Sequence, residues 1–339
     1  MLKSKKIILI LSVLLIIAII SSILFAIRNN IGKAQTKNNE KQENTIEKIN
    51  TTNNSNININ MSKEQLLENI NQAEEGVKID EFLKELKNLE MFAIEFREEN
   101  NVKTSIVELC LQYIRKNKYN SDAWKIAAGN INEEFVKYVS EKSTELLNYN
   151  FQNVKIPNTN VDFVHMCASL NSIIYNSQIV PSEYSGWAGD LVSLMGQIVK
   201  YDENKTNQEL IKYGKMLLGA NSENTLFNEK DMQADIDSIN LSKQISNSFY
   251  IEIINYYYKQ KSIRKNSIIE FRNYLLEKEN KITIYDAVIN NFSKNKVYIN
   301  ALINSLTNSN IAQKYKDNQE KYIEVAARVF EDYFLKNLQ

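Results

Sequence analysis

Apolar residues recur at every third or fourth position along most of the chain after residue 60, a spacing that places them on one face of an α-helix. The C-terminal stretch shows the pattern most clearly, because Tyr322, Val325, Ala326, Val329 and Phe330 fall on a single helical stripe. Alternating apolar and polar residues, which would indicate strands, are rare and are not bounded by hairpin turns. The pattern therefore predicts an all-α fold of about ten helices.

Composition agrees with a helical fold. The chain contains only 2 Pro and 8 Gly among 339 residues, and therefore few helix breakers. With 43% hydrophobic residues it is long and apolar enough to bury one large core or two small ones. We expect a globular multi-helix domain over residues 62–339, with a possible subdivision near residues 151–157.

A long apolar run lies near the N-terminus. Residues 7–26 read IILILSVLLIIAIISSILFA, and a helix of about twenty uncharged residues matches the thickness of a bilayer. Three lysines precede the run and only two cations closely follow it, so the positive-inside rule places the N-terminus in the cytoplasm. We therefore expect residues 1–27 to be a cytoplasmic stub and transmembrane signal anchor of a single-pass protein of the cell membrane, with an extracellular domain. The alternative is a cleaved signal peptide, whose apolar core would be shorter, about 7–15 residues.

Residues 28–61 form a low-complexity segment rich in Asn, Lys, Thr, Glu and Gln. Such a segment has too few apolar side chains to offset the entropy of the chain, so we expect a disordered linker. It would tether the helical domain to the membrane and let it range over the nearby envelope.

The charge balance narrows the choice of partners. The chain carries 41 basic and 41 acidic residues, and no basic stripe is interleaved with aromatic residues. Because a neutral chain has no overall field that attracts phosphate, we exclude nucleic acid as a partner. The expected partners are the membrane, through residues 7–26, and a cell-envelope polymer or an envelope protein.

The chain has 2 cysteines, Cys110 and Cys167, both within apolar helical runs. Two widely spaced cysteines do not make a disulfide framework, so we interpret them as buried thiols that act as small hydrophobic residues. A single bridge between them is the alternative outside the cytoplasm.

Three segments between Asp162 and Asp237 differ from the rest of the chain, and the first contains its only histidine. Asp162 and His165 are three residues apart, so both side chains lie on one face of a helix. Pro157 and Pro181, the only prolines, bracket this helix and indicate where the chain enters and leaves it.

The second segment runs from Tyr184 through Trp187 to Asp190 and contains Gly186 and Gly189. The glycines predict a tight turn and a close approach to another backbone. Asp190 would then lie in or near the first turn of the next helix, where the helix dipole favours a carboxylate.

The third segment carries three aspartates in seven residues. Asp231 and Asp235 are four residues apart and share a helix face, whereas Asp237 points elsewhere. The charges require solvent, hydrogen bonds or a cation. An EF-hand is excluded, because Gln233 and Ile236 occupy the third ligand position and the glycine position of that loop.

We hypothesise that the three segments converge on one polar cleft, although each also has a structural interpretation as a surface pair, an ordinary loop or a solvated face. The candidate catalytic residues are His165, Asp162, Asp190 and Asp235. The candidate substrate-binding residues are Trp187, Tyr184 and Asp237. The candidate metal ligands are Asp231 and Asp235.

Two chemistries fit this set of residues. In the first, the histidine and the aspartates act as general acid and base. In the second, they hold a divalent cation that activates water, which is the one candidate cofactor. The single histidine excludes a histidine-rich zinc site, and the sequence contains no Gly-x-Ser-x-Gly elbow, phosphate loop or dinucleotide fingerprint.

Two functions remain open at this point. The first is a membrane-anchored extracytoplasmic hydrolase that acts on a cell-envelope polymer through an Asp/His cleft. The second is a non-enzymatic envelope protein that binds a partner protein or peptide through its amphipathic helices.

Overall fold

A computed structural model describes residues 63–121, 124–125, 128–157, 159–175, 185–219, 227–259, 266–306 and 308–336. The predicted all-α fold is confirmed for these residues, which form helices and contain no strand. The expected transmembrane segment 7–26 and the linker 28–61 lie outside the described residues. Among the helices that the structure describes, none has the length and apolar character needed to cross a membrane.

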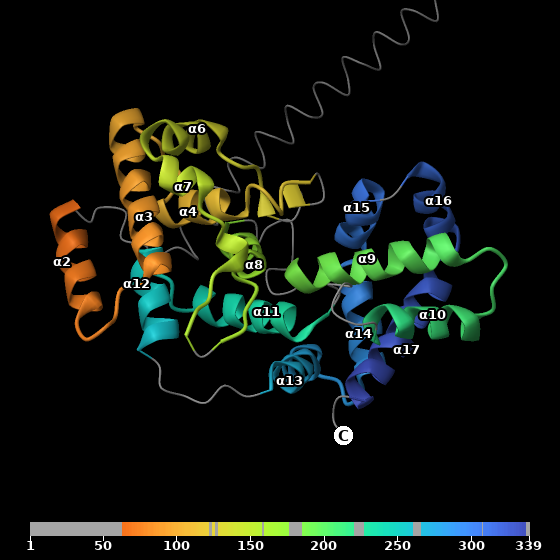
Figure 1. Cartoon of the computed structure of the whole chain (residues 1–339). Helices are drawn as coiled ribbons and strands as arrows, with labels where there is room; N and C mark the ends of the chain where they lie inside the picture. Colours follow the sequence, from red (N-terminus) through yellow and green to blue (C-terminus); the bar gives the residue numbers. More distant parts are fainter. Residues whose placement is uncertain are drawn as a thin grey trace, which may run out of the picture. The chain divides into compact units, whose positions relative to one another are not determined.

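The helices fall into two groups (Figure 1). Each group buries its own cluster of apolar side chains. The first group consists of α2 (Lys63–Glu74), α3 (Glu81–Asn100), α4 (Ile106–Arg115), α6 (Glu133–Lys142), α7 (Thr144–Asn148), the 3-10 turn η1 (Phe151–Asn153), α8 (Phe163–Tyr175), α12 (Phe249–Ile253) and the π-helical turn η2 (Ile254–Tyr258). The second consists of α9 (Ser185–Tyr201), α10 (Asn207–Gly219), α13 (Ser267–Glu279), α14 (Ile284–Lys294), α15 (Lys296–Leu306), α16 (Ser309–Asp317) and α17 (Gln319–Lys336). Between them lies α11 (Glu229–Ser242), which contributes side chains to both cores.

The C-terminal helix α17 lies at the centre of the second group. The apolar stripe that the sequence predicted is buried, and Val325, Val329 and Phe330 are fully covered. Helix α17 packs against α10 and α14. Gly214 of α10 lets the two helices approach closely, because a Cβ atom at this position would lie 2.6 Å from a methyl group of Val329.

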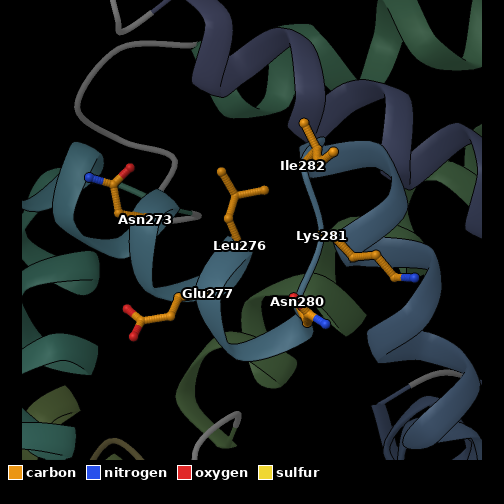
Figure 2. A pocket seen from close by; sticks show the side chains of 6 residues that line it. All are labelled: Asn273, Leu276, Glu277, Asn280, Lys281 and Ile282. Atoms are coloured by element: carbon orange, nitrogen blue, oxygen red, sulfur yellow. The ribbon is translucent and has the colours of Figure 1, made fainter.

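A cavity of about 410 Å³ lies at the C-terminal end of α13 and in the turn that leads to α14 (Figure 2). Its lining residues are Asn273, Leu276, Glu277, Asn280, Lys281 and Ile282. Asn280 ends α13 in the left-handed conformation, which reverses the chain over a short distance. Ile282 follows with 93% of its surface exposed.

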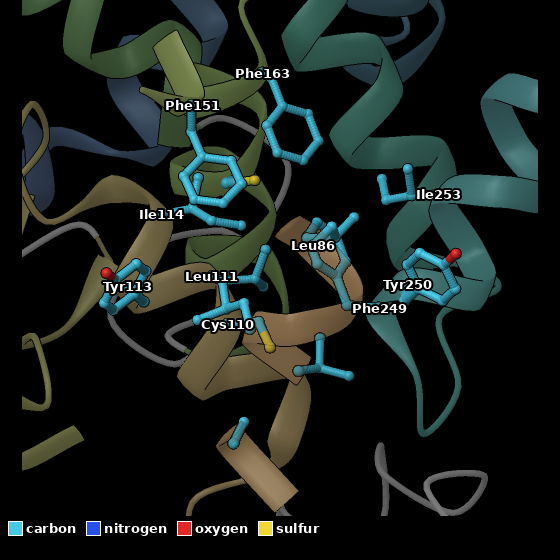
Figure 3. Close-up of a cluster of buried hydrophobic side chains, with 14 of the residues drawn as sticks. Leu86, Cys110, Leu111, Tyr113, Ile114, Phe151, Phe163, Phe249, Tyr250 and Ile253 are labelled. Atoms are coloured by element: carbon cyan, nitrogen blue, oxygen red, sulfur yellow. The ribbon is translucent and has the colours of Figure 1, made fainter. Parts of the chain in front are cut away.

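The core of the first group brings α3, α4, α8 and α12 together (Figure 3). Leu86, Cys110, Phe163 and Phe249 are buried there. Cys110 and Cys167 are both free and buried, as interpreted from the sequence, and burial raises the pKa of each thiol well above its usual value. They therefore behave as small apolar side chains.

Helix α11 connects the two cores because it carries apolar residues on more than one face. Met232 and Ile236 belong to the second core, whereas Ala234 and Leu241 belong to the first. Helix α8 packs along α11, and both helices also contact α9. A helix buried on opposite sides has its polar side chains enclosed as well. The polar residues of α8 and α11 therefore meet inside the domain.

One local prediction was wrong. Helix α9 begins at Ser185, so Gly186 and Gly189 lie inside a helix rather than in a tight turn, and Asp190 follows the first helical turn. Each glycine costs a helix about 1 kcal/mol relative to alanine. The buried residues from Leu191 onward supply packing that outweighs this local preference.

Candidate functional site

The only histidine lies at the contact between α8 and α11. His165 exposes 2% of its surface. Its Nε2 atom lies 3.0 Å from Oδ1 of Asp235 on α11, and its Nδ1 atom lies 3.2 Å from the hydroxyl oxygen of Tyr119. Ser169, one turn further along α8, donates a hydrogen bond of 3.2 Å to the same oxygen of Asp235. The imidazole is thus held from both sides.

The surroundings of His165 favour its charged form. Burial alone would lower the pKa of the imidazole, but the charge and the hydrogen bond of Asp235, with further help from Asp231 and Asp190, raise that pKa to about 10. At neutral pH both ring nitrogens therefore donate, Nε2 to Asp235 and Nδ1 to the oxygen of Tyr119. Burial and the nearby carboxylates raise the pKa of Tyr119, so its hydroxyl group keeps a proton that it can donate elsewhere.

Two aromatic rings cover the outer side of the imidazole. The ring of Tyr119 lies 5.6 Å from the ring of His165, the ring of Trp124 lies 6.3 Å from it, and the two aromatic rings are 4.6 Å apart. Both residues are partly exposed. The buried guanidinium group of Arg115 holds their loop by donating hydrogen bonds of 2.7–3.2 Å to the backbone carbonyl groups of Tyr119, Ala128, Gly129 and Asn130.

Asp231 lies one turn before Asp235 on the same face of α11, as its spacing predicted. Asn228 caps this helix and accepts a hydrogen bond from the backbone of Asp231. Asp231 is 5% exposed, and its Oδ2 atom has no hydrogen-bond partner within the part of the chain that the structure describes. Burial raises the pKa of this carboxyl group to about 6, although the charge of His165 opposes the rise. At neutral pH Asp231 is therefore mainly ionised.

Asp190 reaches the same cluster from α9. Its Oδ2 atom accepts a hydrogen bond of 3.3 Å from the backbone of Phe227, a residue with a positive φ of 54° just before α11. Burial raises the pKa of the carboxyl group to about 8, and the charges of Asp231 and Asp235 add to the rise while His165 opposes it. Burial and the neighbouring carboxylates thus favour the protonated form of Asp190 more strongly than that of Asp231.

Asp162 contributes to the cluster through the backbone rather than through the imidazole ring. Its Oδ1 atom accepts a hydrogen bond of 2.9 Å from the backbone N–H of His165, and its Oδ2 atom accepts one of 2.6 Å from Lys118. Burial raises the pKa of Asp162, but the charge of His165 and the bonds from Lys118 and the backbone lower it to a net value below normal. Asp162 thus caps α8 and positions His165.

Asp237 does not join the cluster. It is fully buried and accepts hydrogen bonds from the hydroxyl groups of Tyr256, at 2.8 Å, and Tyr257, at 2.7 Å, in the π-helical turn. Two residues after Asp235 on a helix, it points to a different side of α11. Tyr184 and the side chain of Trp187 lie outside the described part of the structure.

Metal binding finds no support in the side chains that the structure places. Among the described residues, no group of three or more His, Cys, Asp or Glu side chains is arranged to hold an ion. Asp231 and Asp235, the candidate ligands, share a helix face as predicted, but the Oδ1 atom of Asp235 is already bonded to His165 and Ser169.

Sequence reasoning missed the residues that reach the site from α4 and the loop after it. Tyr119 is 46 residues from His165 in the chain, and no local pattern connects them. Ser169 was recognisable, because it lies one helical turn from His165 and shares its face. Trp124 and Lys118 carried no signal that distinguished them from ordinary helix and surface residues.

The arrangement offers two carboxyl groups that differ in their tendency to hold a proton, and a phenolic donor, around a buried imidazolium. Two carboxyl groups whose surroundings move their pKa values apart are suited to act as acid and base in one reaction. The phenol of Tyr119 can donate a hydrogen bond to an oxygen on which negative charge develops.

A family model described as YkzU uncharacterised protein matches residues 167–339. The matched range contains Asp190, Asp231 and Asp235 and begins two residues after His165. No curated protein matches the chain, and no solved structure does.

Proposed function

The chain belongs to the YkzU family of uncharacterised proteins, and we propose from its own residues that it is a hydrolase that uses the carboxyl groups around His165. The observation that carries the proposal is the pair of Asp190 and Asp231. The surroundings raise the pKa of Asp190 more than that of Asp231, and one oxygen of Asp231 is buried with no partner among the described residues. Both residues lie within the range that the family model matches, whereas His165 does not.

In the proposed reaction Asp231 is the general base. It takes a proton from a water molecule whose oxygen forms a bond to the carbon that is attacked. Asp190 is the general acid and gives its proton to the leaving atom as the old bond breaks. Tyr119 donates a hydrogen bond to the oxygen that becomes negative. Since its own pKa is near 10, His165 remains charged and acts by holding Asp235 and Tyr119.

We propose further that the reaction takes place outside the cytoplasm on a cell-envelope polymer. The apolar run 7–26 and the cations before it support a single-pass anchor with the N-terminus inside. A flexible linker with the length of residues 28–61 has a root-mean-square reach of about 30 Å. The domain would then act on polymer that lies close to the membrane surface.

The test is turnover of isolated envelope polymer by the purified chain, measured as soluble fragments released. Asp190→Asn and Asp231→Asn should each lower kcat by about 100-fold or more, because each removes one proton-transfer partner, while the helical circular dichroism spectrum persists. Asp202→Asn is the matched control, since Asp202 is a buried aspartate at the other end of α9 that binds Lys321 and Tyr322. Turnover that is unchanged in both site variants would contradict the proposal.

A second function is favoured by the surface beside α13. Ile282 is 93% exposed at a cavity of about 410 Å³, so this surface offers an apolar contact to another protein. In this alternative the protein is a non-enzymatic envelope protein that takes up an apolar side chain of a partner at this cavity. Ile282→Asp should then abolish crosslinking to that partner in intact membranes, whereas the exposed Met216→Asp should not.

A further inference from the structure

We infer that the bond cleaved at this site is an amide, and that the site holds the leaving amine as an alkylammonium ion between Asp231 and the rings of Tyr119 and Trp124. The inference rests on the proposed function and adds the class of substrate. Three observations on the described residues support it.

The first observation is the unpartnered oxygen of Asp231. Oδ2 is buried, and the neighbouring cations direct their hydrogen bonds elsewhere, since Lys118 binds Asp162 and His165 binds Asp235 and Tyr119. A buried carboxylate oxygen without a donor destabilises the folded chain, because it has lost its hydrogen bonds to water and gained none in return. The site therefore lacks a donor, and an ammonium group supplies three N–H donors and no acceptor.

The second observation is the charge balance. The cluster contains four carboxyl groups and two cationic groups, namely Asp162, Asp190, Asp231 and Asp235 with Lys118 and His165. Even with a proton on Asp190, one negative charge is left over. A positively charged ligand neutralises this charge, whereas a phosphate-rich or carboxylate-rich polymer brings more negative charge into a confined site and is rejected.

The third observation is the pair of aromatic rings. Tyr119 and Trp124 contact the imidazole with their rings nearly perpendicular to it, with ring centres 5.6 and 6.3 Å from its centre, and both are partly exposed. Aromatic faces attract cations within about 6 Å of the ring centre. Lys118 already illustrates this, because its ammonium nitrogen lies 5.0 Å from the centre of the Tyr119 ring.

These observations favour an organic cation over a metal ion. A metal requires several converging ligands, and no group of three or more suitable side chains occurs in the described part of the chain. An alkylammonium ion requires only one carboxylate oxygen and an aromatic surface for its carbon atoms. Asp231 supplies the oxygen, Tyr119 and Trp124 supply the aromatic surface, and the charge of Asp231 acts on the hydroxyl group of Tyr119.

Amide hydrolysis produces such a cation. The oxygen of water bonds to the carbonyl carbon as Asp231 takes one of its protons, and the carbon–nitrogen bond breaks as Asp190 protonates the nitrogen. The proton on Asp231 then passes to the released amine, which becomes an ammonium ion beside the restored carboxylate. The new carboxylic acid loses its proton to solvent, and Asp190 regains one from solvent. An ester or a glycoside would instead release a neutral alcohol, which has no need of the excess negative charge.

The experiment measures binding and requires no turnover. The full chain is titrated with n-butylammonium and with n-butanol, which has a similar shape and no charge, by calorimetry at neutral pH. We expect n-butylammonium to bind and n-butanol to show no binding. Asp231→Asn should weaken the binding by about tenfold or more, which corresponds to about 1.4 kcal/mol. Asp202→Asn should leave it unchanged.

A second pair of variants covers the case in which Asp231→Asn does not fold. Trp124→Leu should weaken the binding of n-butylammonium, whereas Trp124→Phe, which keeps an aromatic face, should retain most of it. Equal binding of n-butanol, or binding that is insensitive to both Asp231 and Trp124, would overturn the inference and leave the hydrolase proposal to its own turnover test. Cation binding in a chain whose turnover does not depend on Asp190 and Asp231 would support the ammonium site and remove the hydrolase.

Discussion

The pair of His165 and Asp235 allows a prediction whose magnitude follows from the structure. Nε2 and Oδ1 are 3.0 Å apart, and the two residues are 2% and 6% exposed. Asp235→Asn keeps the shape of the side chain and removes its charge. The imidazolium then loses the carboxylate that compensates for its burial, and the folded state is destabilised.

The expected loss depends on pH. In the folded chain the pKa of His165 is raised from 6.5 to about 10, so the stabilisation is complete below pH 6.5 and disappears as the pH rises towards 10. The full rise in the pKa of His165 stabilises the folded state by about 5 kcal/mol at pH 5.5 and by about 1 kcal/mol at pH 9. Asp190 and Asp231 contribute part of it, so the share of Asp235 is smaller. We therefore expect Asp235→Asn to cost about 3–5 kcal/mol at pH 5.5, the usual cost of breaking a buried ion pair.

The measurement is urea unfolding of the purified chain at pH 5.5 and at pH 9, followed by far-ultraviolet circular dichroism. Ser169→Ala is the control, because Ser169 binds the same oxygen of Asp235 through a neutral hydroxyl group. Ser169→Ala should lower the free energy of unfolding by about 1 kcal/mol, and by the same amount at both pH values. If Asp235→Asn costs less than about 1 kcal/mol at pH 5.5, or costs as much at pH 9, the buried ion pair is not what holds α8 on α11.

Two further predictions concern stability. Gly214→Ala should destabilise the fold by about 1–3 kcal/mol despite the better helix propensity of alanine, because the new Cβ would lie 2.6 Å from a methyl group of Val329. The measurement is urea unfolding, and a stabilised variant would show that α10 and α17 are not so close. The free energy of unfolding of the whole chain should fall between pH 5 and pH 9. Burial raises the pKa of Asp190 from 3.8 to about 8 and that of Glu90 from 4.5 to about 7, so the unfolded chain releases these protons at lower pH than the folded chain does. A thermal midpoint that rises over this range would contradict the burial of these carboxyl groups.

Much of the helical architecture follows from local pattern. The stripe from Tyr322 to Phe330 became the buried face of α17 because a 3.6-residue period leaves a helix only one apolar side to cover. The shared face of Asp231 and Asp235 follows from the same geometry. The glycines before Asp190 were misinterpreted, because local propensity costs only about 1 kcal/mol per residue and the packing of the residues that follow outweighs it.

The candidate site was predictable only in part. The sequence identified His165, Asp190 and Asp235 as unusual, and the fold brings their charges together. The sequence could not show which aspartate binds the imidazole of His165 and which caps its helix, because Asp162 and Asp235 both suit the role of ring partner. The structure assigned the cap to Asp162 and the ring to Asp235.

The sequence by itself determined the helical period and the faces on which side chains lie, because these depend on residues within a few positions of one another. Tertiary structure alone decided that Tyr119 and Trp124 contact His165, that Asp237 binds the tyrosines of η2, and that an oxygen of Asp231 is buried without a partner among the described residues. These contacts join residues far apart in the chain. They depend on how α4, α8 and α11 pack, and burial in that packing is what sets the charge state of each group.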